Sequence, residues 1–114
     1  MAGAVIDLDH LARYTGGDQT LNAEILRLFD VQADELVARL QAILEARDAK
    51  SWKVAVHTLK GAARGIGAFG LGDAAAAAEP IDPANDEKTA TAALKELESK
   101  AQAVRLFIKA HLGA

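Results

Sequence analysis

The apolar residues of this chain recur every three or four positions over long segments. This spacing puts them on one side of an α-helix, because a helix turns by roughly 100° per residue. In the segment 19–47 the apolar residues are Leu21, Ile25, Leu28, Phe29, Leu36, Leu40, Ile43 and Leu44. We therefore expect long helices that each bury one face against the rest of the chain.

Glycine, proline and aspartate residues divide the sequence into five helical segments. Gly16-Gly17 is expected to end the first helix, because glycine adopts a positive φ at no steric cost. Asp48 is a good N-cap for the third helix, and a helix could not easily cross Pro80 and Pro83. The expected helices cover about residues 7–15, 19–47, 49–69, 71–79 and 86–112.

These segments predict an all-α fold, an antiparallel four-helix bundle with a short extra N-terminal helix that caps one end. The run Ala74–Ala78 favours a helix and lets it lie close to its neighbours. The residues expected to point inward are Trp52, Val56, Leu59, Ala63 and Ile66 in the third helix and Leu94, Leu97, Ala101, Val104, Ile108 and Leu112 in the fifth. A chain of 114 residues is the size of one domain, so we expect a single domain over 1–114.

Composition excludes several classes of function. The absence of cysteine rules out disulfide scaffolds, thiol catalysis and cysteine-ligated zinc. A net charge of -3 makes nucleic acid an unexpected partner, and no apolar run approaches the roughly 20 residues of a membrane span. The segment Met1–Ala4 lacks the features of a signal peptide, and the initial methionine favours a complete small protein. We expect a cytoplasmic protein, by default a monomer, that binds no membrane.

His57 is the residue in this chain best suited to chemistry. If the core-facing stripe of the third helix is set at 0°, His57 lies roughly 140° away, on the solvated side with Lys53, Lys60 and Arg64. A neutral imidazole is a good nucleophile, and an unperturbed histidine is largely neutral at pH 7. An exposed histidine can also be idle, and the lysines and arginine can form an ordinary basic helix face.

The neighbours of His57 favour a phosphoryl acceptor over an idle side chain. A phosphoryl group on the imidazole would bring about two negative charges, and Lys60 and Arg64 lie one and two helical turns further on. Gly61 costs roughly 1 kcal/mol relative to alanine in mid-helix, but it leaves a dimple where another protein could approach. Gly65 extends this bare strip. The alternatives for Gly61 are a tight contact with another helix and neutral drift.

The segment around His57 closely resembles the motif of histidine-containing phosphotransfer (HPt) domains of bacterial phosphorelays. The matching residues are His57-Thr58-Leu59-Lys60-Gly61-Ala62-Ala63, Gly67 and Leu71. The stretch Leu8–Phe29, with its turn Thr15–Asp18, and the turn Ala46–Asp48 resemble those of the family as well. The resemblance covers essentially the whole chain and implies a single HPt domain.

This resemblance implies a specific function. His57 would accept a phosphoryl group on its outer nitrogen from a receiver-domain phospho-aspartate or from a sensor or hybrid histidine kinase. It would then pass the group to the aspartate of another response-regulator receiver domain. Lys60 would steady the phosphoryl oxygens, while Gly61 would leave room for the receiver. Arg64 and Gly65 depart from the small and small polar residues common at these positions, and Arg64 could supply extra charge or tune the choice of partner.

The same resemblance implies a phosphocarrier and not an enzyme. Phosphoryl transfer depends mainly on positioning and charge neutralisation, and no acidic cluster in the chain resembles a magnesium site. We expect no cofactor or metal of its own, with Mg²⁺ supplied by the receiver. Lys53 and Val54 are expected on the docking surface, although Val54 could equally be an ordinary scattered surface valine.

Four other functions can be weighed against the same sequence: an adaptor, a kinase, a dinucleotide-binding protein and a metal-binding protein. The chain could be a helical adaptor that binds a receiver domain or histidine kinase without carrying phosphate, although the pair His57 and Lys60 argues against this. A kinase needs an ATP-binding domain for which the bundle leaves no space. The pattern Gly65–Gly70 fits Gly-x-Gly-x-x-Gly, but a dinucleotide site needs a preceding strand. His10 and His111 share no metal-ligand spacing with His57.

Overall fold

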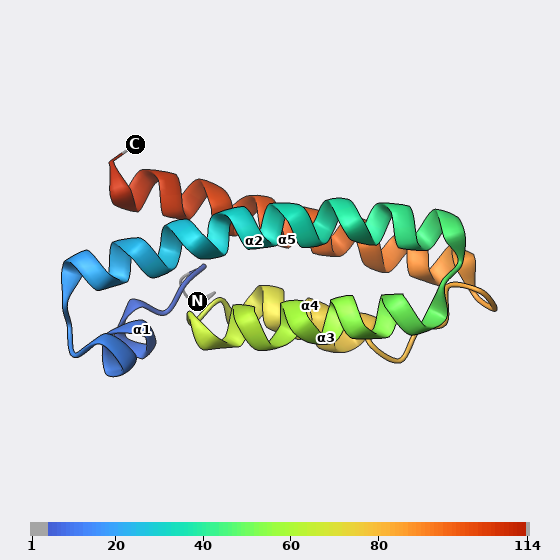
Figure 1. Ribbon diagram of the computed structural model, residues 1–114, viewed down its shortest axis with the longest axis horizontal. Helices are drawn as coiled ribbons and strands as arrows, with labels where there is room; N and C mark the ends of the chain where they lie inside the picture. Colours follow the sequence, from blue (N-terminus) through green and yellow to red (C-terminus); the bar gives the residue numbers. More distant parts are fainter. Residues whose placement is uncertain (1–4, 114) are drawn as a thin grey trace.

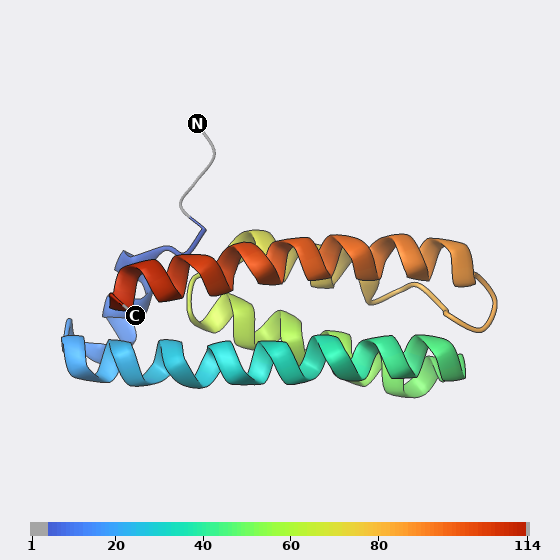
Figure 2. The ribbon, with the colours of Figure 1, turned by 90° about the horizontal axis from the view of Figure 1, so that it is seen from above.

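The computed structural model describes residues 5–113, and these residues form five α-helices and no strand. The helices are α1 (Leu8–Thr15), α2 (Gln19–Ala46), α3 (Ala49–Gly65), α4 (Phe69–Ala78) and α5 (Glu87–Leu112). Helices α2 to α5 run alternately up and down, as the two views in Figures 1 and 2 show. The expected all-α fold, an antiparallel bundle with a short extra N-terminal helix, is confirmed.

Each bundle helix packs against two others. Helix α3 lies between α2 and α4, and α5 contacts α4 and α2, which closes the ring. The bundle measures 45 × 28 × 21 Å, and α2 and α5 run along its longest dimension (Figure 1). Helices α3 and α4 are shorter, so they do not reach the N-terminal end of α2 (Figure 1). Helix α1 lies at that end, below the first turns of α2 (Figure 1).

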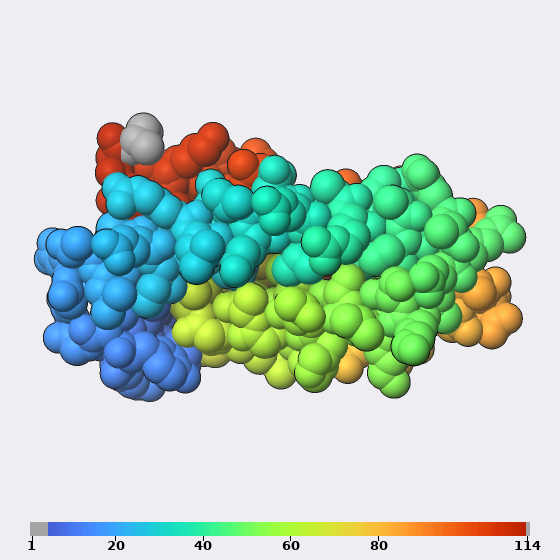
Figure 3. All heavy atoms as spheres, viewed as in Figure 1, coloured from blue at the N-terminus to red at the C-terminus, as the bar shows by residue number. Residues whose placement is uncertain are grey.

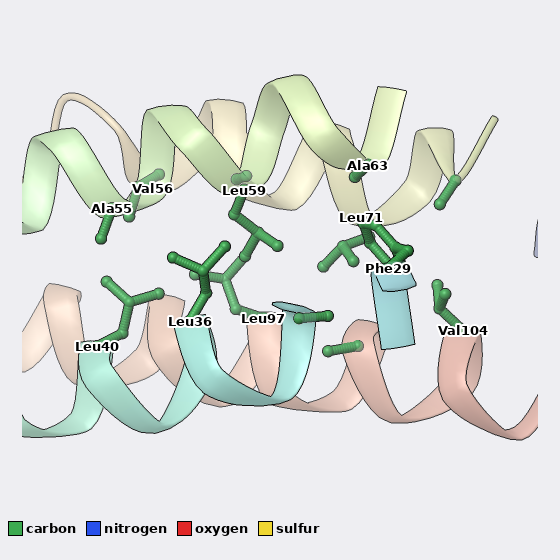
Figure 4. Close-up of a cluster of buried hydrophobic side chains, with 14 of the residues drawn as sticks. Phe29, Leu36, Leu40, Ala55, Val56, Leu59, Ala63, Leu71, Leu97 and Val104 are labelled. Carbon is green, nitrogen blue, oxygen red and sulfur yellow. The ribbon is translucent and has the colours of Figure 1, made fainter. Parts of the chain in front are cut away.

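The core is apolar throughout, and no polar or charged side chain among the described residues is buried in it. Figure 4 shows how side chains of α2, α3, α4 and α5 meet in its middle. The expected inward residues of α3 and its C-terminal turn are all buried, as are those of α5 except Leu112, which is partly buried. Buried alanines such as Ala63 and Ala75 allow the backbones of α3 and α4 to lie close together.

Two residues of α2 do not lie where the spacing predicts. Leu21 and Leu28 are 39% and 59% exposed. Apart from a few contacts with α1, helix α2 packs against α3 and α5, so its buried stripe is narrow. That stripe consists of Leu26, Phe29, Ala33, Leu36, Leu40 and Leu44. Leu21 and Leu28 are therefore on the flank of the helix, and the prediction that they point inward is wrong.

Aspartate N-caps explain where four of the helices begin. The side chains of Asp7, Asp18, Asp48 and Asp86 each accept a hydrogen bond from the backbone N–H three residues further on. Each bond satisfies one of the donors that the first helical turn leaves without a partner. The expected N-cap role of Asp48 is confirmed.

The turn between α3 and α4 differs from the expected boundaries of 49–69 and 71–79. Helix α3 ends at Gly65, and α4 already begins at Phe69. Gly67 explains this turn, because its φ is +85° and its carbonyl accepts a hydrogen bond of 2.9 Å from the backbone N–H of Asp7. A Cβ at Gly67 would lie 2.6 Å from the carbonyl oxygen of Asp7. The pattern Gly65–Gly70 therefore forms a helix–helix turn, without the strand that a dinucleotide site requires.

None of the helices in the described part of the chain is long and apolar enough to cross a membrane. The expected cytoplasmic location stays a prediction. The expectation for Met1–Ala4 concerns residues outside the described range 5–113.

Candidate functional site

His57 lies in the middle of α3, on the side of the helix that faces away from the core. Its side chain is 66% exposed, whereas Val56 and Leu59 on the same helix are fully buried. This placement follows from the helical period, which puts His57 opposite the apolar stripe. The imidazole is therefore accessible to a second protein, as the sequence predicts.

A carboxylate that the sequence analysis did not identify contacts this imidazole. Glu79 directly follows the last residue of α4, and its Oε2 lies 3.1 Å from His57 Nδ1. Its other oxygen, Oε1, accepts a hydrogen bond of 2.6 Å from Lys60 Nζ. The Glu79 and Lys60 side chains are only 20% and 22% exposed. One carboxylate thus joins His57 and Lys60 and connects α3 to the end of α4.

The charges of Glu79 and Lys60 indicate which nitrogen of the His57 imidazole carries the proton. The hydrogen bond from Lys60 lowers the pKa of Glu79 most, and the hydrogen bond to His57 lowers it further, against an opposing contribution from partial burial. Glu79 is therefore ionised at neutral pH and can only accept hydrogen bonds. Nδ1 of His57 must then carry the proton. In the neutral ring this leaves the lone pair on Nε2, which has no hydrogen-bond partner among residues 5–113.

Arg64 is directed toward α4 and not toward His57. Its Nη2 lies 3.6 Å from Asp73 Oδ1, and its side chain passes over Gly72. A Cβ at Gly72 would lie 2.8 Å from Arg64 Cγ. Both members of the ion pair are well exposed, so the contact is a weak one. The expected role of Arg64 at a phosphoryl group stays a prediction.

The surface of α3 beside His57 is bare. A Cβ placed on Gly61 or Gly65 would meet no atom within 4 Å, which excludes a tight helix contact as the reason for Gly61. Val54 is 60% exposed and Lys53 is exposed as well. Figure 3 shows that α2 and α3 together form one continuous face of the molecule.

The remaining histidines lie in aromatic contacts away from His57. His10 packs edge-on against Tyr14 and Phe69, and His111 stacks on Phe107. Within residues 5–113, no group of three or more His, Cys, Asp or Glu residues is placed to hold a metal ion. The expectation that the chain binds no metal of its own stays a prediction.

The chain is similar in sequence to one family model and in fold to a solved structure. The family model described as "Hpt domain" matches residues 24–107 of the chain. The crystal structure of histidine-containing phosphotransfer protein B (HptB) from Pseudomonas aeruginosa PAO1 superposes with a TM-score of 0.86, at 23% sequence identity and with 96% of each chain covered. At this identity the second match shows a shared fold. No curated protein matches the chain significantly.

Proposed function

The chain belongs to the Hpt domain family, whose members are histidine phosphotransfer intermediates of phosphorelays, and on this premise we propose that His57 is the residue that carries the phosphoryl group. One observation carries the proposal: His57 is exposed, its Nδ1 is bound by an ionised carboxylate and its Nε2 is free. A histidine held in this way presents a lone pair to an incoming phosphorus atom.

The chemistry requires little more of this chain than positioning. The Nε2 lone pair would attack the phosphorus of a receiver aspartyl phosphate. As the N–P bond forms, the P–O bond to the aspartate breaks, and its electron pair stays on the leaving carboxylate. Lys60 Nζ, which donates to the same carboxylate as the ring, would offset part of the charge that arrives with the phosphoryl group. The reverse sequence returns the phosphoryl group to a receiver.

We propose response-regulator receiver domains and a histidine kinase as partners, because the family works with both. The surface offered to them includes Lys53, Val54, Gly61 and Gly65 beside His57, since all four are exposed. The receiver would contribute Mg²⁺ together with its acceptor aspartate. On this view the chain is a carrier, and the partner supplies the catalytic groups.

The test is phosphorylation of the wild type and of His57→Gln by a phosphorylated receiver with Mg²⁺ and, separately, by phosphoramidate. We expect one acid-labile adduct of a single phosphoryl group on the wild type and none on His57→Gln, measured by intact-mass spectrometry. His111→Gln is the matched control, because His111 is also an exposed histidine on a helix but lies next to Phe107. An adduct on His57→Gln would show that another residue is the acceptor.

The helical adaptor considered above gives a different result. A folded wild type that binds a receiver but takes no phosphoryl group from any donor would contradict the carrier function and support the adaptor.

A further inference from the structure

Glu79 places a negative charge next to the atom that the proposed function loads with a phosphoryl dianion. Its Oε2 accepts a hydrogen bond of 3.1 Å from His57 Nδ1, and its Oε1 accepts one of 2.6 Å from Lys60 Nζ. A site built only to store phosphate would be expected to avoid this anion, because like charges at short range repel. The arrangement suggests that the site is adapted to release the group as well as to accept it.

The proton on Nδ1 decides how easily the phosphoryl group leaves Nε2. When Nδ1 keeps its proton, cleavage of the N–P bond returns the electron pair to Nε2 and yields a neutral imidazole. When that proton has been lost, the same cleavage would have to yield an imidazolate anion, which is a much poorer leaving group. Phosphohistidine is therefore reactive in the protonated form and persistent in the deprotonated form.

Resting on the proposed function of His57, we propose that Glu79 retains the Nδ1 proton on the phosphorylated ring and so makes phospho-His57 a short-lived, readily transferred donor at neutral pH. The carboxylate accepts the Nδ1–H bond before the reaction, and it stays in place while the phosphoryl group resides on Nε2. A hydrogen bond between two ionised groups is stronger than one between neutral groups. The Glu79 carboxylate therefore favours the phosphorylated ring with a proton on Nδ1 over the ring that has lost it.

The charged groups around His57 identify Glu79 as the one that can act in this way. Helix α3 itself contributes only cations besides His57, and none of them can accept a hydrogen bond from Nδ1; they are Lys50, Lys53, Lys60 and Arg64. From α4, Asp73 pairs with Arg64. Within the described part of the chain, no charged group of α2 forms a hydrogen bond or ion pair with His57.

The experiment compares the wild type with Glu79→Gln, which keeps the shape of the side chain but removes its charge. Both proteins are phosphorylated with phosphoramidate, freed from the donor, and followed from pH 5 to 9 by intact mass for the loss of the phosphoryl group. At neutral pH we expect phospho-His57 in Glu79→Gln to survive about three- to tenfold longer, with the acid-induced acceleration moved about half a unit to one unit lower in pH. Glu98→Gln is the control, because Glu98 is an exposed carboxylate on α5 that forms no ion pair among residues 5–113.

A purely structural role for Glu79 predicts another result. Equal lifetimes and equal pH profiles in the wild type and Glu79→Gln would overturn the inference and leave the carrier function intact. A shorter lifetime in Glu79→Gln would also overturn it, since Glu79 would then protect the phosphoryl group. Absence of any adduct on the wild type would instead remove the proposed function on which the inference rests.

A second readout needs no phosphoryl group. The ¹⁵N chemical shifts of the imidazole report which nitrogen carries the proton in the unmodified protein. We expect the Nδ1–H form of His57 in the wild type and a mixture of tautomers in Glu79→Ala. A wild-type ring protonated mainly on Nε2 at neutral pH would contradict both the hydrogen bond and the inference built on it.

Discussion

Two glycines six positions apart serve different purposes. Gly61 lies inside α3 with open space around it, whereas Gly67 has a φ of +85° and lies against the backbone of Asp7. We expect Gly61→Ala to stabilise the protein by about 0.5–1 kcal/mol, because alanine is the better helix former. We expect Gly67→Ala to destabilise it, since a Cβ would lie 2.6 Å from Asp7 O. Urea denaturation measures both effects, and destabilisation by Gly61→Ala would contradict the first.

If the role of Gly61 is to let a receiver domain approach His57, Gly61→Ala should impair transfer from a receiver. We expect Gly61→Ala, and more strongly Gly61→Leu, to slow phosphorylation by a receiver while leaving phosphorylation by the small donor phosphoramidate unchanged. Equal slowing with both donors would place the effect at His57 itself and not at docking.

Glu79 should also make the stability of the folded protein depend on pH, with a sign that follows from the shift of its pKa. Its pKa in the folded state is lowered, mainly by the hydrogen bond from Lys60. The stabilisation it contributes is therefore complete above the unfolded value of about 4.3 and is lost as pH falls through the lower, folded value. We expect an NMR titration of the Glu79 carboxylate to show a midpoint below 4.3, and Lys60→Met to raise that midpoint. A midpoint that Lys60→Met does not raise would contradict the assigned cause.

His57 and Lys60 could be identified from the sequence because the period of one helix places both of them off its core-facing stripe. Glu79 could not be identified in this way. Its partners lie 22 and 19 residues earlier, and the contact depends on how closely α3 and α4 pack. The one sequence signal at Glu79 is a charge at the end of an alanine run, which an ordinary surface helix would share.

The aspartate N-caps of the helices make a prediction about stability. Asp18 Oδ1 accepts a hydrogen bond of 3.1 Å from the backbone N–H of Leu21 at the start of α2. We expect Asp18→Ala to lower the free energy of unfolding by about 1 kcal/mol and Asp18→Asn to lower it by much less, because asparagine also caps. Chemical denaturation distinguishes the two. Equal losses would mean that charge, and not the cap geometry, is responsible.

The limits of α1, α2 and α5 agree with the predicted ones to within one residue, since aspartate and glycine at their ends are local signals. The predicted end of α3, at residue 69, is four residues too late. The reason is physical: apolar residues continue to Ile66, but the helix closes in a turn in which Gly67 has a φ of +85° and the backbone N–H of Ala68 donates to the carbonyl of Ala63. Leu21 and Leu28 were misplaced because the spacing of apolar residues does not reveal how many neighbours a helix has.

The stability of the protein is expected to differ from one helix to another. Helix α1 has eight residues, of which only Leu11 is buried, whereas α3 contributes five buried residues to the core. Helices this short are not stable on their own, so α1 depends on its few contacts with the rest of the chain. We expect the amides of α1 to exchange hydrogen well before those of α3 in an exchange experiment followed by mass spectrometry. Equal protection of the two helices would show that α1 unfolds only with the bundle.

The hydrogen bond between Trp52 and the end of α4 has an optical consequence. Trp52 is the only tryptophan in the sequence, it is fully buried, and its Nε1 donates to the carbonyl of Ala78 at 3.0 Å. Ala78 immediately precedes Glu79, so the fluorophore is tied to the backbone that positions the carboxylate. Any displacement of that backbone when a phosphoryl group arrives would change the polarity around the indole. The intrinsic emission of this protein therefore offers a label-free check on the site: unchanged emission on loading of His57 would agree with a carboxylate that stays in place, and a changed emission would show that it moves.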